Sequence, residues 1–327
     1  MRSRCWLITA LAFAIWTLFA CAFPVRAGVA TPVAPGVYLV AGATPPNAQP
    51  DGNSVILEAP QGLIVFDTGR HAEHTQHLID FARTAGRPVG AIINSHWHLD
   101  HVGGNPMLRA AFPGVRVYAS SALEGALGDF LAKYRAQLVQ AIAQPGQDPA
   151  AQASMRTEVA LIDAGPALGP TDTVTASGRR SIAGRILDLH LEHGAVTAGD
   201  VWVFDRQTSV LLAGDLVTLP APFLDTACPE HWQAALDRLA RVRFKLLIPG
   251  HGAPLERSGF ATYRKAFGGL LRCAASEQPK STCIDGWIAD AGSLIAAADQ
   301  RYARTLIDYY LDQVLRGHAD RMQKLCA

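Results

Sequence analysis

The chain has 327 residues, of which 49% are hydrophobic and 17% charged, and its formal net charge is +1. This length suits one large α/β domain that carries an added segment. Because the charges are nearly balanced, there is no electrostatic reason to expect a nucleic acid as a partner.

Residues 1–27 have the pattern of a signal peptide. Two arginines precede an apolar run over residues 6–22, and Val25-Arg26-Ala27 provides a small-residue cleavage site. The apolar run is too short for a stable membrane span, so we expect a periplasmic or secreted protein. Cys21 lies in a loosely lipobox-like sequence, which makes a lipid anchor the less favoured alternative.

From residue 28 onward, short strands and amphipathic helices follow one another. The expected strands cover residues 36–40, 54–57, 63–66, 89–93, 187–191, 202–205 and 210–213. Helical patterns cover residues 72–84, 230–242, 261–273 and 293–315. In the last of these, an apolar stripe that includes Tyr302, Tyr309 and Tyr310 indicates core packing, with a dimer seam as the alternative.

A helical insert is expected at about residues 121–164. Its apolar residues recur at helical spacing, from Leu123 through Phe130 and Tyr134 to Ile142, and the Pro- and Gly-containing segment 144–149 then breaks the helix. Such an insert is either a lid over a binding pocket or a packed helical hairpin without a catalytic duty.

Residues 95–101 read Ser-His-Trp-His-Leu-Asp-His and directly follow the expected strand over 89–93. This segment therefore places His96, His98, Asp100 and His101 in a loop at the end of a buried strand, where the rigid backbone can direct them toward one point. Imidazoles and carboxylates are ordinary zinc ligands. The sequence thus predicts a metal site, and a chance surface run of histidines is the less favoured reading.

The H-x-H-x-D-H spacing resembles that of the metallo-β-lactamase-fold hydrolases. Three more segments occur in the order that this family shows, each ending a hydrophobic run with Asp67, Asp215 or His251. The resemblance covers most of the chain and implies an α/β fold, a four-layer αββα sandwich over residues 28–255. Residues 256–327 would then form a C-terminal helical extension.

The resemblance also implies a ligand set around one or two zinc ions. One ion would take Asp100, His101, Asp215 and His251, and a second would take His96 and His98 and share Asp215. Asp100 is the candidate catalytic residue, because a carboxylate at this position can also pass a proton to the leaving group.

One ligand position departs from the family pattern. The family has a further histidine in a loop that resembles A-H-T-x-G-D, and here Ala195-Val196-Thr197-Ala198-Gly199-Asp200 places Val196 at that point. Valine cannot bind a metal. His193 is the nearest substitute, and the alternative is a strand-end histidine that is hydrogen-bonded to backbone. Without His193 we expect the second ion to bind weakly or not at all.

The residue type at position 215 helps to distinguish the possible substrate classes. Relatives with β-lactamase activity typically have Cys or Ser there, so Asp215 looks more like thioesterases, lactonases, sulfatases or phosphodiesterases. We expect an exported zinc hydrolase of a small ester, thioester or lactone, similar to periplasmic enzymes of quinoprotein or sulfur oxidation. The alternatives are a non-catalytic metal-binding accessory protein, a true β-lactamase and an iron redox site. The expected partner is a small-molecule substrate, and the oligomeric state stays open.

Four cysteines remain after a signal peptide would be removed, which suggests disulfides in an oxidising compartment. Three pairings are possible. We favour Cys273–Cys283, which closes a short loop around Pro279, together with Cys228–Cys326, which ties the C-terminus to the core; buried free thiols are the alternative for the second pair.

Overall fold

The computed structural model describes residues 29–45, 48–317 and 323–326. The expected signal peptide and Cys21 lie outside these described residues. Within them, no helix is both long and apolar enough to cross a membrane.

Two β-sheets form the centre of the molecule. The first sheet has the order β1 (Thr31–Ala34), β2 (Val37–Val40), β3 (Ser54–Ala59), β4 (Gly62–Phe66), β5 (Val89–Ile93), β6 (Arg116–Ala119) and β7 (Asp172–Thr173). The second has the order β12 (Leu246–His251), β11 (Val210–Thr218), β10 (Asp200–Asp205), β9 (Arg185–Glu192) and β8 (Gly178–Ile182). In the first sheet β1 to β4 pair antiparallel and β4 to β7 pair parallel.

The side-chain alternation of the strands explains why the sheets stack. On β4, Ile64 and Phe66 join the hydrophobic cluster between the sheets, whereas Leu63 and Val65 join the cluster on the outer face. On β10, Val203 faces the shared cluster while the neighbouring tryptophan faces outward. Each central strand therefore buries both of its faces, which needs helices outside both sheets.

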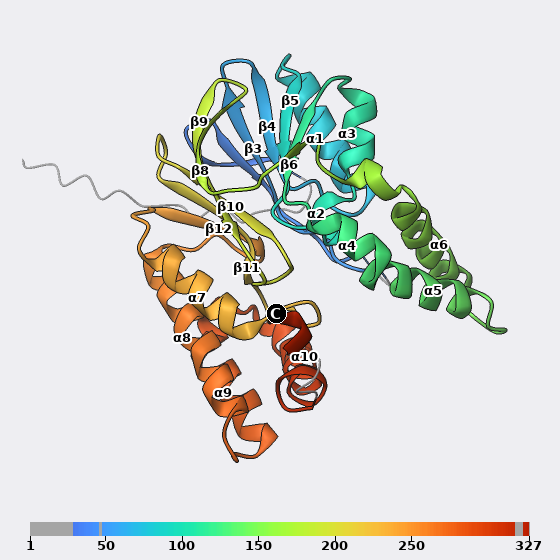
Figure 1. Cartoon of the computed structure of the whole chain (residues 1–327), viewed down its shortest axis with the longest axis vertical. Coiled ribbons are helices and arrows are strands. Elements are labelled where there is room, and N and C mark those ends of the chain that lie inside the picture. The colour runs from blue at the N-terminus through green and yellow to red at the C-terminus, as the bar shows by residue number, and fades with distance from the viewer. Residues whose placement is uncertain (1–28, 46–47, 318–322, 327) are drawn as a thin grey trace, which may run out of the picture.

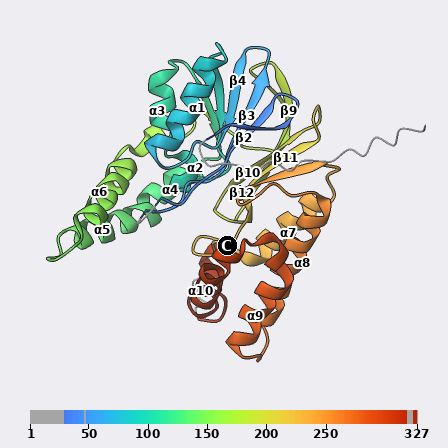
Figure 2. The same ribbon diagram turned by 180° about the vertical axis from the view of Figure 1, so that it is seen from behind.

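Helices supply these outer layers. The first sheet is covered by α1 (Ala72–Thr84) and α3 (Asn105–Ala111), and the second by α7 (Pro229–Ala240) and α8 (Arg257–Ala274). Figures 1 and 2 show the resulting order of helices, sheet, sheet and helices from opposite sides. The predicted four-layer αββα fold is confirmed, and most predicted strands lie within two residues of their observed bounds.

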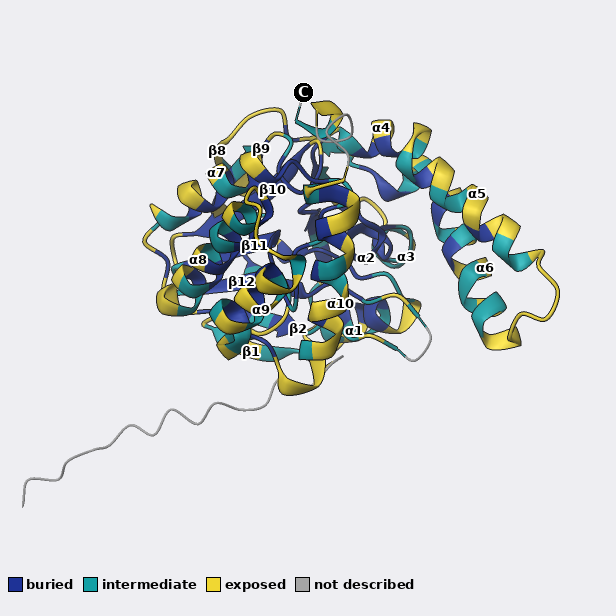
Figure 3. Ribbon diagram, turned by 90° about the horizontal axis from the view of Figure 1, so that it is seen from below, coloured by how far each residue is buried: buried dark blue, intermediate teal, exposed yellow. Residues whose placement is uncertain are grey.

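The insert consists of α4 (Ala122–Gly128), α5 (Phe130–Ile142) and α6 (Pro149–Asp163). Figure 3 shows α5 and α6 as an arm that extends away from the body, with an exposed tip. The base of the arm packs on the segment that carries the metal motif: Leu131 and Ile162 share a cluster with Trp97, Leu99 and Val102. The arm is a packed helical hairpin whose base, and not its tip, reaches the predicted metal site.

The C-terminal region differs in part from the prediction. An additional helix, α9 (Lys280–Ala291), was not expected, because its sequence mixes small, polar and apolar residues without a clear apolar stripe. The helix expected over 293–315 begins later than predicted: two 3₁₀ turns precede α10 (Gln300–Tyr310), and a π-helical turn at Leu311–Leu315 then continues it to the predicted end. The backbone is extended at Ile295 and Ala296, which lets Ile295 bury its side chain and ends helical geometry there.

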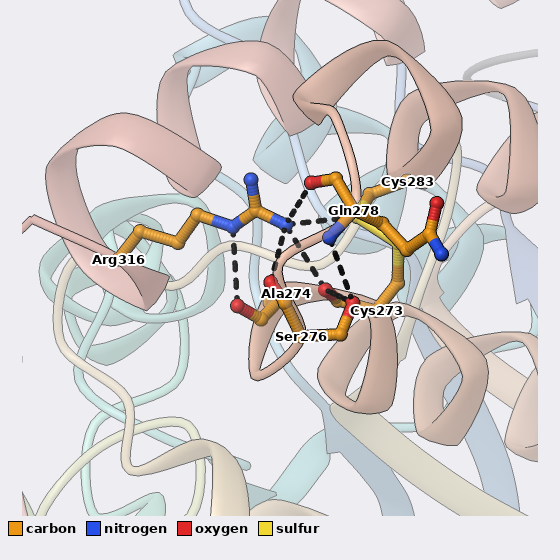
Figure 4. Close-up of a disulfide and its surroundings, with 6 residues drawn as sticks. All are labelled: Cys273, Ala274, Ser276, Gln278, Cys283 and Arg316. Carbon is orange, nitrogen blue, oxygen red and sulfur yellow. Dashed lines mark hydrogen bonds between the residues drawn. A yellow bond between two sulfur atoms is a disulfide. The ribbon is translucent and has the colours of Figure 1, made fainter.

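Both favoured disulfides are present, Cys228–Cys326 and Cys273–Cys283. Figure 4 shows the second of them beside the guanidinium of Arg316, which follows a π-helical turn at Leu311–Leu315. Arg316 donates to backbone carbonyls at the end of α8 and in the following loop, those of Cys273, Ala274, Ser276 and Gln278. This arginine therefore links the end of the π-helical turn to the disulfide-closed loop.

Candidate metal centre

The metal motif begins where β5 ends. The side-chain amide of Asn94 donates from Nδ2 to the backbone carbonyl of His101 at 2.9 Å, which folds residues 95–101 back over the strand end. The short helix α2 (Leu99–Val102) holds the second half of the motif. The backbone N–H of Val201 on β10 donates to the carbonyl of Ser95 at 2.6 Å, so the loop is also tied to the second sheet.

Six of the seven predicted ligands gather in two groups. His96, His98 and Asp215 form one group, and Asp100, His101 and His251 form the other; within each group, one possible ligand atom per residue lies within 4.8 Å of the others. Asp215 comes from β11 and His251 ends β12, whereas the motif follows β5. The site is therefore built at the ends of strands from both sheets.

Asp215 lies between the two groups and divides its oxygens between them. Its Oδ2 is 3.9 Å from Nε2 of His96, whereas its Oδ1 is 3.2 Å from Nε2 of His101 and 3.6 Å from Nε2 of His251. Nε2 of His96, Nε2 of His101 and Oδ1 of Asp215 are buried and have no hydrogen-bond partner among the residues that the structure describes. Buried polar atoms are rarely left in this state, and converging nitrogen and oxygen lone pairs suit a metal cation.

Hydrogen bonds orient the imidazoles for this role. Ser95 Oγ donates to Oδ2 of Asp67 at 2.7 Å, so it accepts the proton on Nδ1 of His96 at 2.9 Å. His101 donates from Nδ1 to the same Asp67 oxygen at 2.9 Å. Both rings therefore turn a lone pair on Nε2 toward the site, and Asp67 acts through these contacts and not as a ligand.

His98 is oriented the opposite way. Thr226 Oγ1 donates to the carbonyl of Val196 at 2.9 Å and so accepts the proton on Nε2 of His98 at 2.9 Å. The lone pair of His98 is consequently on Nδ1. Sequence reasoning missed Thr226, since a threonine in a loop 128 residues away carries no recognisable signal.

Close packing leaves little freedom around Asp215. A Cβ atom on Gly250 would lie 1.9 Å from Oδ1 of Asp215 and 2.8 Å from its backbone nitrogen. Only glycine lets β12 approach the carboxylate this closely. This explains the Pro-Gly-His sequence that ends the strand in front of His251.

Burial and charge set the protonation of the ligands. Burial lowers the pKa of His98 to about 4 and holds that of His96 well below its ordinary value, so both are neutral at pH 7 and can ligate. Burial also opposes the charged forms of His101 and His251. There the carboxylates of Asp215 and Asp100 outweigh it and raise the pKa of both imidazoles. A bound cation would replace those protons.

Val196 occupies the position of the missing histidine. Its backbone N–H donates to Oδ2 of Asp200 at 2.9 Å, which closes the loop on this aspartate, while its side chain is buried in the hydrophobic cluster outside the second sheet. His193 is exposed and lines a separate pocket with Ser120 and Ala198. Among the described residues, His193 therefore joins neither ligand group.

Two further residues near the ligands carry charge. Arg70 lies 3.3 Å from Asp100 and also contacts Glu158, which comes from α6 of the insert. Aromatic rings border the other side: the centroid of His98 is 4.6 Å from that of Trp97 and 5.0 Å from that of Phe223. Arg70 follows the Asp67-Thr-Gly turn closely, but nothing in the sequence relates Glu158 to it.

Comparison with known proteins agrees with this geometry. Residues 49–251 match the model of the metallo-beta-lactamase superfamily. A linear primary-alkylsulfatase from Pseudomonas sp. is 26% identical over 223 residues, which are 62% of this chain and 41% of that enzyme. The chain thus spans less than half the length of this relative.

Two solved structures share the fold. A metallo-beta-lactamase from Pontibacter korlensis has a TM-score of 0.53 and 22% identity, over 73% of this chain and 98% of that one. A stereoselective inverting sec-alkylsulfatase from Pseudomonas sp. has a TM-score of 0.57 and 21% identity, over 88% of this chain and 50% of that one.

Proposed function

Because the chain belongs to the metallo-beta-lactamase superfamily of hydrolases, we propose that it is a zinc-dependent hydrolase of a small-molecule ester. The observation that carries this proposal is that buried nitrogen and oxygen atoms of His96, His101 and Asp215 converge on one point and lack hydrogen-bond partners among the described residues. Sulfate esters with an apolar alkyl group are the first substrate class to test, since the relative that aligns over 223 residues is an alkylsulfatase and aromatic rings flank His98.

Zinc bound at this site would activate water near neutral pH and polarise the bond under attack. The protein residues prepare that chemistry. Neutral His96 and His98 supply lone pairs without first losing a proton. Burial opposes the charge of Asp100, but His101, His251 and Arg70 outweigh it and hold the pKa of this carboxyl well below its ordinary value. Asp100 is therefore a carboxylate at neutral pH and able to ligate a metal.

The two ligand groups are unequal, and we propose one tightly held ion. Asp100, His101 and His251 together with Oδ1 of Asp215 provide four protein ligands. The other group provides His96, His98 and Oδ2 of Asp215, and Val196 stands at the sequence position where the family pattern has a further histidine. The second group would bind an ion more weakly, because it offers one ligand fewer.

Export is part of the proposal. The pattern of residues 1–27 and the two disulfides support an oxidising compartment such as the periplasm or the outside of the cell.

The deciding experiment measures zinc content and hydrolysis for the wild type and for Asp215→Ala, using alkyl sulfates, carboxylic esters, thioesters, lactones and a β-lactam. We expect the wild type to turn over at least one ester class, and Asp215→Ala to lose bound metal and about a hundredfold or more in rate. The half-exposed Asp237, replaced by alanine, serves as the control and should change neither quantity.

Because Val196 replaces a histidine of the family pattern, a second candidate function is that of a non-catalytic metal-binding protein. A wild type that binds zinc but hydrolyses no member of the panel would favour that function and contradict the enzyme proposal.

A further inference from the structure

A buried ionic chain connects the helical insert to the metal ligands. Nη1 of Arg70 lies 2.5 Å from Oε2 of Glu158 on α6, and Nη2 lies 3.3 Å from Oδ1 of Asp100. The three side chains are only 10%, 6% and 9% exposed, respectively. Buried charges cost much free energy unless each is paired, so this arrangement is a constraint on where the three groups can lie.

Arg70 is held in place by more than these two contacts. Its Nε donates to the carbonyl of Pro50 at 3.1 Å, and its backbone N–H donates to Oδ1 of Asp51 at 2.7 Å. Asp51 also accepts from the backbone and from Nδ1 of His71, both at 2.9 Å. The planar guanidinium group is therefore held in one orientation, with Nη1 on Glu158 of the insert and Nη2 on Asp100.

The two carboxylate oxygens of Asp100 have different contacts. Oδ1 faces Arg70, whereas Oδ2 lies 2.9 Å from Nε2 of His251 and 3.5 Å from Nε2 of His101. If Arg70 did not hold Oδ1, the carboxylate could rotate about its Cβ–Cγ bond. The guanidinium of Arg70 thus leaves only Oδ2 of Asp100 directed toward the point where His101 and His251 converge.

We propose that Glu158 and Arg70 are positioning residues for the ligand Asp100, and that the helical insert thereby sets the affinity and geometry of the metal site. This inference rests on the proposed function, since it needs a metal at Asp100. Groups that orient metal ligands typically change metal affinity 10- to 100-fold when they are removed. Glu158 acts by holding Arg70, and Arg70 acts by fixing Oδ1 of Asp100.

The chain offers a matched control on the same helix. Asp163 of α6 pairs with Arg135 of α5 in an exposed ion pair, whose Nε–Oδ1 distance is 2.6 Å and whose side chains are 48% and 42% exposed. Glu158→Gln and Asp163→Asn each remove one carboxylate charge from α6. Only Glu158→Gln disturbs the chain that ends at Asp100.

The experiment measures zinc affinity by competition with a chromophoric chelator and records the visible spectrum of the cobalt-substituted protein, for the wild type, Glu158→Gln, Arg70→Lys and Asp163→Asn. We expect Glu158→Gln and Arg70→Lys to bind zinc about tenfold more weakly and to shift the cobalt bands, with Asp163→Asn within about twofold of the wild type. Arg70→Lys keeps the positive charge but cannot contact Glu158 and Asp100 with two separate nitrogens. It tests the same inference independently if Glu158→Gln fails to fold.

A purely structural role gives a different pattern. Thermal unfolding of the metal-free variants would then show a loss of stability, while zinc affinity and the cobalt spectrum stay at the values of Asp163→Asn. That result would overturn the inference and leave the proposed function intact. A wild type that binds neither zinc nor cobalt would overturn the proposed function itself.

Discussion

At the scale of single residues, Val196 separates this chain most clearly from the family pattern. Its loop is closed by hydrogen bonds, since the N–H groups of Val196 and Thr197 donate to the carboxylate of Asp200. The side chain is 1% exposed and close to His98 through Thr226, which bonds to both residues. The backbone carbonyl of Val196 is thus linked to His98 through Thr226, while the side chain of Val196 lies in the hydrophobic cluster outside the second sheet.

Restoring that ligand should change the number of bound metals. We expect Val196→His to raise tightly bound zinc from one to about two ions per chain, because the group at His96 and His98 would gain the ligand it lacks. Elemental analysis after dialysis against a weak chelator measures this. Val196→Leu is the control and should stay at one ion, and an unchanged stoichiometry in Val196→His would show that a side chain at position 196 does not face the site.

At the scale of elements, helix ends and loops account for most of the differences from expectation. The end of α8 is stabilised by Arg316, whose side chain reaches its carbonyls from a segment 42 residues later in the chain. The Cys273–Cys283 disulfide closes the same loop. The two constraints together fix α9 against α8 at a point where the local sequence favours no single structure.

Replacing Arg316 should weaken this connection without touching the metal centre. We expect Arg316→Ala to lower the free energy of unfolding by about 1 kcal/mol, a modest value because the arginine is exposed to solvent. Urea denaturation measures it, with Arg301→Ala on the exposed side of α10 as the control. Zinc content should stay at the wild-type value, and a loss of metal in Arg316→Ala would contradict the separation of these two regions.

At the scale of the whole molecule, the metal centre joins the two sheets. His96, His98, Asp100 and His101 follow β5 of the first sheet, whereas Asp215 and His251 belong to β11 and β12 of the second. A cation held by both sets would cross-link the sandwich at its strand ends. Binding to the folded state alone stabilises it by mass action.

Removal of the metal should therefore destabilise the entire domain. When free zinc exceeds its dissociation constant a thousandfold, we expect a chelator to lower the stability by about 4 kcal/mol. Calorimetry with and without the chelator measures this difference. It should shrink as the pH falls, because the raised pKa values of His101 and His251 let protons compete with the metal. Asp215→Ala should show a much smaller chelator effect, and an equal effect would contradict the cross-link.

The sequence by itself determined most of the strands and the metal motif at residues 95–101. The resemblance to the metallo-β-lactamase-fold hydrolases implied the four-layer fold and added Asp215 and His251 to the ligand set, and of the three possible disulfide pairings the favoured one is present. The strands and the metal motif depend on local information, namely β-branched runs and the 95–101 spacing. Because a strand delivers the residue at its end to a fixed edge of the sheet, such residues can be placed without knowing the packing.

Only the tertiary structure decided which groups support the ligands. The ion pair of Arg70 with Glu158 joins residues 88 positions apart, and the bond of His98 to Thr226 joins residues 128 apart. In the folded structure His193 is exposed and lines another pocket, although it is only three positions from Val196 in the chain. Such contacts depend on how the insert and loops pack against the strand ends, and helical periodicity specifies a buried face without specifying its partner.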